Sequence, residues 1–222
     1  MARVLMLAFE GMQPLDFIAP YDLFHSAGVE TLVVSENAKT QVDKRLGIAA
    51  DASLSDAPEA DAILVPGGHG IGSCLAHDAT LEFLAHCKVQ WYTSICTGSL
   101  LLAAAGLLRG YRATSHWRYV DLLALAGATP VKGKRIVIDR NRMTGGGVTA
   151  GIDFGLHLVA HLCGEDQARL AQLALEYAPV PPYAGSPEEA LSETTRAYRE
   201  RSAVRYAELE HALDEALLRF RG

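Results

Sequence analysis

Cys96 is the residue whose surroundings point most clearly to chemistry. It lies within SICTG, residues 94–98, between a β-type run that starts at Val89 and an alanine- and leucine-rich helical stretch that ends at Leu108. A strand that passes directly into a helix, with small residues two places before and after the turn residue, is typical of a nucleophile elbow. Such a turn favours positive φ and an exposed side chain at its centre. Because a helix N-terminus stabilises a thiolate, the pattern predicts a reactive, low-pKa cysteine.

A cysteine nucleophile needs a group that moves protons, and Asp16 is well placed for that role. It follows the first predicted strand, Arg3–Phe9. Burial and a neighbouring thiolate would both raise the pKa of its carboxyl group, so that it could act as an acid and then as a base near neutral pH. The alternative is an aspartate that caps the helix predicted over Asp16–Ala27. The residues alone leave both interpretations open.

Two glycine-rich turns and one histidine are expected near the cysteine. Residues 66–70 (PGGHG) follow the predicted strand Asp61–Val65, and residues 143–147 (MTGGG) follow Arg135–Asp139. Glycines let backbone N–H groups approach a reacting centre, so the first turn is a candidate oxyanion-type donor set or a plain turn. His116 ends a short predicted strand, and it either points toward the site or has a structural role.

Other kinds of site have little support. His157 and His161 have the i,i+4 spacing of a zinc helix, but Leu158 stands where the catalytic glutamate would be. The remaining mixed set is too irregular for a closed zinc site; its members are Cys74, His77, His86 and Cys87. Neither GxGxxG nor GxxxxGK occurs, so nucleotide binding is not predicted. We therefore predict no metal site.

The elements that must position these residues alternate between strand and helix. This order predicts an α/β fold, a three-layer sandwich with a mainly parallel, flavodoxin-like sheet and a nucleophile elbow. The expected strands are Arg3–Phe9, Thr31–Ser35, Asp61–Val65, Val89–Ile95, Arg112–Ser115 and Arg135–Asp139, with a hairpin around Arg45–Ala49. The expected helices are Asp16–Ala27, Asp78–Lys88, the stretch after the elbow, Arg118–Ala126, Thr149–Cys163 and Glu165–Tyr177. Ligands bind such folds at the carboxyl ends of the strands.

The chain of 222 residues fits a single domain, with residues 1–178 as its core and 179–222 as a C-terminal extension. The extension begins with a proline-rich stretch and continues into a helix predicted over Glu188–Phe220. An apolar stripe runs along that helix; it comprises Leu209, Leu213, Ala216, Leu217 and Phe220. The stripe must pack on the same subunit or on another one, and the sequence does not decide between them.

Composition limits the function classes. A net charge of −6 and a pI near 5.7 argue against nucleic acid as a partner. No run of about 20 apolar residues is present, so no membrane segment is predicted. Because the N-terminus shows no signal-peptide pattern, we expect a cytoplasmic protein. Its four cysteines, which form no CxxC, are then expected to be free thiols.

Four segments together resemble the ThiJ/PfpI superfamily, which has a class I glutamine-amidotransferase-like fold. They are VPGGHG (65–70), TSICTGSLLLAAAGLL (93–108), ATSHW (113–117) and TGGGVTAGIDFGLHL (144–158). Their order and spacing cover most of residues 1–178. Three further pieces are most similar to the branch that adds water to isocyanides, R–N≡C, to give N-substituted formamides. These pieces are LDFIAPYD (15–22), ICTGS (95–99) and LEYAPVPPYAGSP (175–187).

The resemblance implies a role for each matching residue. Cys96 would attack the isocyanide carbon and form a covalent thioimidate, and Asp16 would supply a proton and then activate water. Thr97 would hydrogen-bond within the site and help to place Asp16 or the water. The implied substrate-binding residues are Gly68, His69, Gly146 and Val148. The resemblance also implies a homodimer that needs no metal or organic cofactor, with a small isocyanide as its substrate.

Two departures from the superfamily's other branches are informative. Proteolytic and deglycase-like members carry a histidine after the cysteine and a glutamate after the first strand, where this chain has Thr97 and Asp16. This counts against a protease and weakens a deglycase or glyoxalase interpretation. The extension is also too short and too acidic for a fused helix-turn-helix regulator. A non-catalytic thiol sensor, in which Cys96 oxidises to a sulfinate, remains a second class of function.

Overall fold

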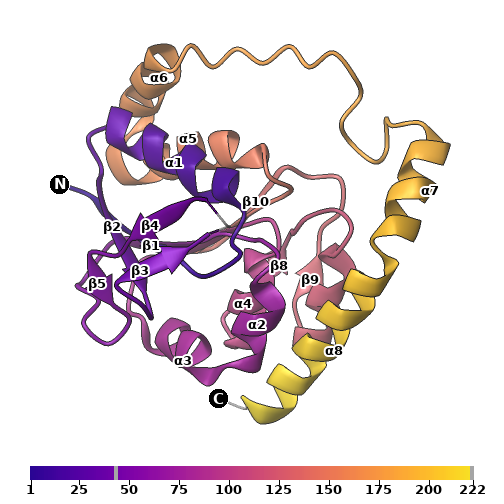
Figure 1. Ribbon diagram of the computed structural model, residues 1–222. Coiled ribbons are helices and arrows are strands. Elements are labelled where there is room, and N and C mark those ends of the chain that lie inside the picture. Colours follow the sequence, from indigo (N-terminus) through magenta and orange to yellow (C-terminus); the bar gives the residue numbers. More distant parts are fainter. Residues whose placement is uncertain (43–44, 221–222) are drawn as a thin grey trace.

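A seven-stranded sheet forms the middle layer of the computed structural model, which describes residues 1–42 and 45–220 (Figure 1). Its order is β10-β11-β7-β6-β1-β2-β5, and only β10 runs antiparallel to its neighbour. The strands are β1 (Arg3–Leu7), β2 (Glu30–Ser35), β5 (Ala52–Ser53), β6 (Ala62–Val65), β7 (Trp91–Ile95), β10 (Ile136–Asp139) and β11 (Arg142–Gly145). The run β2-β1-β6-β7-β11 has the flavodoxin-type order, which confirms the predicted fold class.

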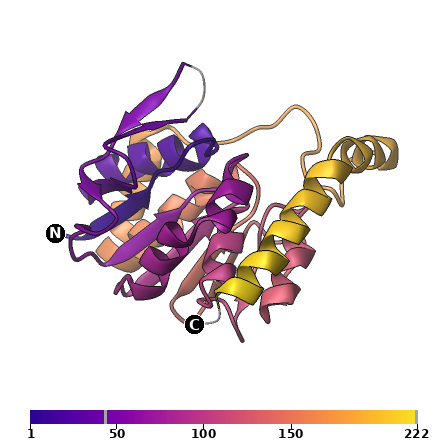
Figure 2. The same ribbon diagram turned by 60° about the horizontal axis from the view of Figure 1, so that its bottom comes forward.

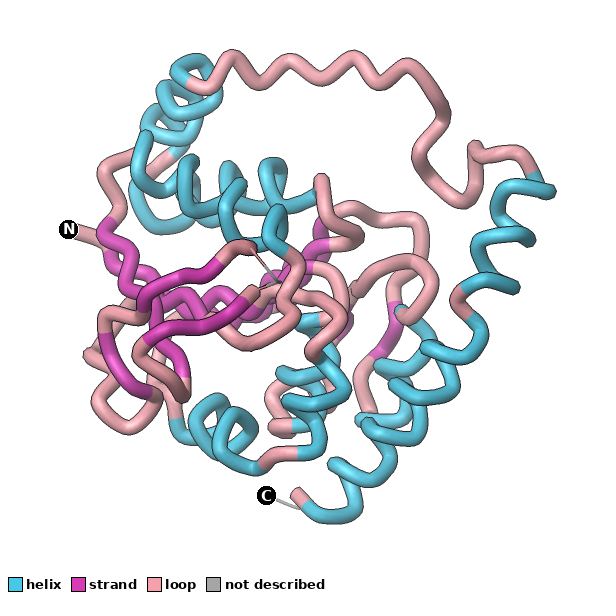
Figure 3. The backbone as a smooth tube through the Cα atoms, viewed as in Figure 1, coloured by secondary structure: helices cyan, strands magenta, loops and turns pink. Residues whose placement is uncertain are grey.

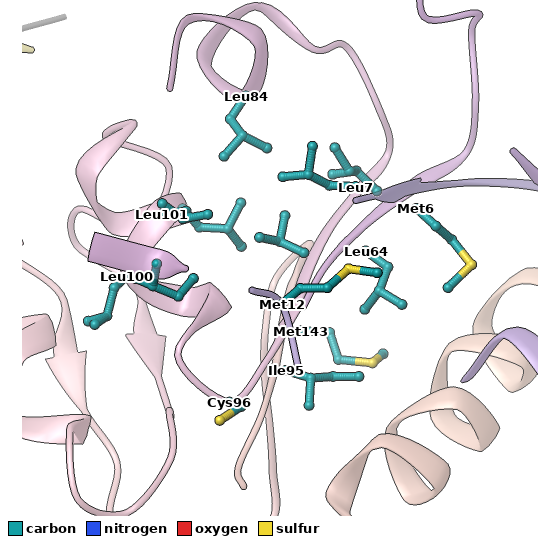
Figure 4. Packing of buried hydrophobic residues seen from close by; sticks show 14 of the residues in the cluster. Met6, Leu7, Met12, Leu64, Leu84, Ile95, Cys96, Leu100, Leu101 and Met143 are labelled. Carbon is teal, nitrogen blue, oxygen red and sulfur yellow. The ribbon is translucent and has the colours of Figure 1, made fainter. Parts of the chain in front are cut away.

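Helices cover both faces of the sheet (Figure 1). One face carries α1 (Pro14–Ser26), α5 (Ala150–Cys163) and α6 (Glu165–Ala174), and the other carries α2 (Ile71–Ala76), α3 (Asp78–His86) and α4 (Gly98–Ala104). The central strands are nearly continuous apolar runs because both of their faces are buried. Their side chains pack with those of α3 and α4, and Cys96 lies at the margin of this core (Figure 4).

Three local predictions differ from the structure. Residues 143–147 were expected to form a glycine turn, but residues 143–145 belong to β11. Arg142, which begins this strand, is buried and donates to the Leu107 carbonyl, and its guanidinium lies over the Tyr92 ring. The strand expected over Arg112–Ser115 is only β8 (Arg112–Ala113), which pairs with β9 (Thr129–Pro130) outside the main sheet. The helix expected over Arg118–Ala126 is the shorter 3₁₀ helix η1 (Val120–Ala126).

The predicted hairpin is present, formed by β3 (Lys39–Gln41) and β4 (Gly47–Ala49), although residues 43–44 in it lie outside the described ranges. Helix α2 was not predicted. None of the helices in residues 1–42 and 45–220 is long and apolar enough to span a membrane.

The extension returns to the body of the same chain after a long loop that follows α6 (Figure 3). It forms two helices, α7 (Ser192–Arg201) and α8 (Ala203–Arg219), where one was predicted. In Figure 2, α8 lies along the side of the sandwich, where it contacts α2 and α4. Leu209, Leu213 and Ala216 are buried there. The apolar stripe is therefore covered by its own subunit.

Candidate active site

Loops after three neighbouring strands meet at the carboxyl edge of the sheet, as predicted. They follow β1, β6 and β7, and backbone groups tie them together. The N–H of Gln13 donates to the Gly67 carbonyl at 2.7 Å, and the N–H of Gly67 donates to Asp16 Oδ2 at 2.9 Å. The N–H of Gly68 donates to Thr97 Oγ1 at 3.1 Å. These bonds bring Asp16 and the cysteine turn into one site.

Cys96 has the backbone conformation of a nucleophile elbow, with φ of +56°. Its N–H donates to the carbonyls of Gly145 and Gly146 at 3.0 and 2.9 Å. Its carbonyl accepts hydrogen bonds from Ser99 Oγ at 3.1 Å and Ser115 Oγ at 2.9 Å. A non-glycine residue with positive φ is costly, and surrounding bonds of this kind hold it in place. The predicted elbow and its positive φ are confirmed.

Glycine is required on the helix side of the elbow because the turn touches the end of β6. A Cβ atom on Gly98 would lie 2.2 Å from the Val65 carbonyl oxygen and 2.7 Å from that of Pro66. A Cβ on Gly67 would lie 2.6 Å from the Thr97 nitrogen and 2.8 Å from the Cys96 Cβ. The close approach at Gly98 explains the glycine two places after Cys96.

We therefore expect Gly98→Ala to destabilise the protein by about 3 kcal/mol, because its methyl group would overlap backbone atoms that cannot move freely. In a chain of this size that corresponds to a loss of roughly 6–12 °C in Tm. Gly72→Ala in α2 is the matched control, since the nearest atom to its Cβ would be 3.8 Å away. Thermal melts of the two variants test the expectation, and an unchanged Tm for Gly98→Ala would contradict it.

Asp16 is fully buried and does not cap its helix. The capping position of α1 is Gln13, which makes no side-chain capping bond, and the Asp16 carboxyl group instead bonds to the loop after β6. Its second oxygen, Oδ1, has no hydrogen-bond partner among the described residues. Burial raises the pKa of Asp16 to about 7, while the Gly67 N–H and the Cys96 thiol lower it in part. The capping interpretation is wrong, and a buried carboxyl group with a free oxygen beside a thiol needs another explanation.

The Cys96 thiol is less acidic than the sequence predicts. Burial raises its pKa above the usual range, and the nearby Asp16 carboxylate raises it further. Hydrogen bonds from the N–H groups of Thr97 and Val148 and from the Thr97 hydroxyl lower it in part. The thiolate expected from the helix N-terminus is therefore not the resting form, because burial and like charge outweigh the short helix α4. The two groups titrate as a coupled pair that holds at least one proton at neutral pH.

The other predicted residues occupy different parts of the site. Thr97 is buried between the cysteine and the loop after β6, and Val148 lies against the sulfur. The N–H groups of Gly67 and Gly68 are already bonded to Asp16 and Thr97, so they are not free oxyanion donors.

Gly146, His69 and His116 lie around the elbow and the pocket that it faces. Gly146 supports the elbow from behind through its carbonyl, and Val148 is the member of that turn that lines the pocket. His69 is exposed at the pocket rim and is hydrogen-bonded to Arg205. His116 is part of the pocket wall, and burial, with a contribution from Arg118, lowers its pKa to about 4, so it is neutral.

Cys96 opens into a cavity of about 630 Å³ whose outer wall comes from the extension. The lining residues from the core include Gln13, His69, His116, Tyr119 and Val148. The extension contributes Tyr198, Arg201, Ser202, Arg205, Glu208 and Leu209. None of the six was predicted to line the site. Leu209 belongs to the predicted apolar stripe, and the other five continue its spacing of three and four residues toward the N-terminus of the extension. That continuation is the signal that could have identified them.

Metal chemistry gains no support from the side-chain arrangement. Within residues 1–42 and 45–220, no group of three or more His, Cys, Asp or Glu side chains is placed to hold a metal ion. His161 packs edge-on against Trp91 at 4.7 Å and its Nδ1 bonds to the His157 backbone carbonyl, so the His161 ring has a structural role.

Known proteins resemble this chain in both sequence and structure. The model of the DJ-1/PfpI family matches residues 2–161. The isonitrile hydratase of Pseudomonas putida is 46% identical over 202 residues, which cover 89% of this chain and 88% of the relative. A crystal structure of a ThiJ/PfpI family protein from Pseudomonas syringae superposes with a TM-score of 0.91 at 38% identity, covering 96% of this chain and 90% of that one. DJ-1beta of Drosophila melanogaster shares the fold, with a TM-score of 0.70 at 22% identity over 80% of this chain and 99% of its own.

Proposed function

This chain belongs to the DJ-1/PfpI family, and from that premise we propose that it is an isonitrile hydratase, which converts an isocyanide and water into an N-substituted formamide. The observation that carries the proposal is the pairing of Cys96 with Asp16. A buried carboxyl group with a pKa of about 7 and a free oxygen is suited to moving protons at a thiol. The 46% identity to the Pseudomonas putida enzyme supports the same activity.

In the first step, the Cys96 sulfur bonds to the terminal carbon of R–N≡C while that carbon gains a proton. The product is a covalent thioimidate, R–N=CH–S–Cys96. The proton originates on the thiol and passes through Asp16, so the net change is addition of S–H to one carbon. Since Asp16 takes the proton as the C–S bond forms, a free thiolate need not accumulate. This fits a thiol whose pKa is raised by burial.

In the second step, water adds to the thioimidate carbon and the nitrogen gains a proton. Asp16 accepts a proton from the attacking water and passes it to the nitrogen, which gives the adduct R–NH–CH(OH)–S–Cys96. The hydroxyl proton of this adduct then passes through Asp16 to the sulfur as the C–S bond breaks, releasing R–NH–CHO and the free thiol. Thr97, whose hydroxyl accepts from the Gly68 N–H, would hold the sulfur in place relative to the loop after β6, to which Asp16 is also bonded. Atoms and protons balance without a metal or organic cofactor.

The competing functions differ in what they need from the site. A redox sensor needs a thiolate, because the thiolate is the form that peroxide oxidises, and a raised thiol pKa slows that reaction. A glyoxalase or deglycase would also use Cys96, but its family pattern has a glutamate and a histidine where this chain has Asp16 and Thr97. Hydration of an isocyanide uses both residues that are present.

The direct test is to mix the purified protein with phenyl isocyanide and follow N-phenylformamide. We expect steady formation that a chelator does not stop. Loss of methylglyoxal without any formamide would overturn the proposal in favour of the glyoxalase branch. Inactivity in both assays, with rapid sulfinate formation at Cys96 in dilute peroxide, would favour the sensor. We also expect the enzyme to be cytoplasmic and to form a homodimer in solution.

We expect kcat/KM to rise with pH to a plateau, with an apparent pKa of about 7. Below that pH both Asp16 and Cys96 are protonated, and no group can accept the thiol proton. Loss of one proton from the pair creates the active form, so activity increases as pH increases. Initial rates between pH 5 and 9, corrected for the enzyme-free reaction, test this. A kcat/KM that falls through pH 7 would mean that the doubly protonated pair is the active form.

A further inference from the structure

The wall that faces Cys96 across the pocket is built by the junction of α7 and α8. Arg118 Nε donates to Ser202 Oγ at 3.0 Å, which fixes this junction to the segment before η1. Arg205 donates to the Gly68 carbonyl at 2.5 Å and bonds to His69, which fixes it to the loop after β6. At the far end, Arg219 Nε bonds to Asp78 at 2.7 Å. The junction is therefore held over the cavity at both sides.

Part of this wall is aromatic. The rings of His116 and Tyr198 stack with centroids 6.0 Å apart, and Trp117 packs against Tyr198 at 5.2 Å. Tyr119 stacks with Tyr206 at 6.1 Å and is only 4% exposed. His116, Tyr119 and Tyr198 line the cavity. A flat, rigid ring would be well matched by these faces.

The rest of the wall is cationic. Arg201 and Arg205 both line the cavity, and neither takes part in the ion pairs formed within the described ranges. Glu208 lies near Arg205 and raises its pKa, but burial lowers it by more. Arg201 contacts the Tyr198 ring at 5.8 Å. Of the arginine, lysine, aspartate and glutamate side chains, those named in the cavity lining are Arg201, Arg205 and Glu208. Guanidinium groups that line a cavity without an ion pair to a carboxylate favour an anionic ligand.

We propose that the extension makes the enzyme selective for aromatic isocyanides that carry a carboxylate. The proposal rests on the isonitrile hydratase activity proposed above. The isocyanide carbon would meet Cys96, the ring would lie against Tyr119 and Tyr198, and the carboxylate would reach Arg201 and Arg205. A cavity of about 630 Å³ is far larger than a small alkyl isocyanide needs, and it accommodates a substituted ring.

The test compares 3- and 4-isocyanobenzoate with their methyl esters, which keep the ring and remove the charge. Of the two acids, the better substrate should have a kcat/KM about tenfold higher than that of its methyl ester. Charge-assisted hydrogen bonds to arginine would give a difference of this size. Arg201→Gln should reduce this acid-to-ester ratio to near one, mainly through KM for the acid. Arg201→Lys, which keeps the positive charge, should retain part of the acid-to-ester ratio that Arg201→Gln loses. Raising the salt concentration should lower it, because Arg201 is exposed.

Arg196→Gln provides the matched control. Arg196 lies on the same helix, pairs with Glu200 and does not line the cavity, so the acid-to-ester ratio should keep its wild-type value. Equal or higher kcat/KM for both esters in the wild-type protein would overturn the selectivity proposal while leaving the hydratase proposal intact. A wild-type preference that Arg201→Gln and Arg205→Gln both leave intact would also overturn it. No formamide from any acid, ester or unsubstituted phenyl isocyanide would instead show that the hydratase proposal itself fails.

Discussion

Replacing Cys96 with alanine should lower formamide formation by at least about 10⁴-fold, to the level of the uncatalysed reaction. The sulfur forms the bond to the isocyanide carbon, and no other group at the elbow can replace it. Of the four free cysteines, Cys96 is the one that lines the cavity. The measurement is the initial rate of formamide formation under saturating isocyanide. Rapid acid quench and intact-protein mass spectrometry should show an added mass equal to that of the isocyanide in the wild type only.

The control for this prediction is Cys163→Ala, which removes a thiol at the end of α5 and should keep full activity. Cys96→Ala should also stay folded, because the hydrogen bonds that hold the elbow use its backbone N–H and carbonyl groups. A melting temperature close to that of the wild type would exclude unfolding as the cause of inactivity. Substantial turnover by folded Cys96→Ala would refute the covalent mechanism.

The second large effect is expected from Asp16→Asn. Asparagine keeps the size of the side chain and an acceptor for the Gly67 N–H, but it cannot take the thiol proton. We expect kcat to fall by roughly 10³-fold, which is within the usual range for loss of a general acid–base group. The rise of kcat/KM through pH 7 should disappear together with the titrating carboxyl group. Asp22→Asn, an exposed position on the same helix, is the matched control and should behave like the wild type.

The same substitution should stabilise the protein above neutral pH. The pKa of Asp16 is raised from 3.8 to about 7 in the folded chain, so the folded state holds a proton that the unfolded state has lost. The stability of the wild type therefore decreases as pH rises from about 4 and levels off above pH 7, where the buried carboxylate is charged. A shift of this size corresponds to about 4 kcal/mol as an upper estimate.

Thermal or denaturant melts at pH 4.5 and pH 8 test this linkage. The advantage of Asp16→Asn over the wild type should be small at the lower pH and largest at the higher one. If the two proteins differ equally at both pH values, the Asp16 carboxyl group does not titrate near neutrality. A variant that loses activity while gaining stability is the pattern expected when a buried charge is kept for function.

Much of this protein follows from local rules that the sequence displays directly. Buried strands such as Arg3–Leu7 and Ala62–Val65 are recognisable as unbroken apolar runs, since both faces of a parallel sheet are covered. The elbow around Cys96 is recognisable because its geometry excludes side chains at Gly98. The order of strands and helices then determines which loops share the carboxyl edge of the sheet, and this brings Asp16 to Cys96.

The tertiary structure decided the properties that depend on distant neighbours. The sequence predicts a thiol with a lowered pKa at Cys96, but burial and the Asp16 carboxyl group raise that pKa instead. Strand β11 has no apolar pattern because Arg142 is buried through contacts with Leu107 and Tyr92, which lie far away in the chain. The pocket wall comes from Tyr198, Arg201 and Arg205, more than 100 residues after the cysteine. Desolvation, charge proximity and helix docking depend on the folded arrangement of the whole chain, so no local pattern could specify them.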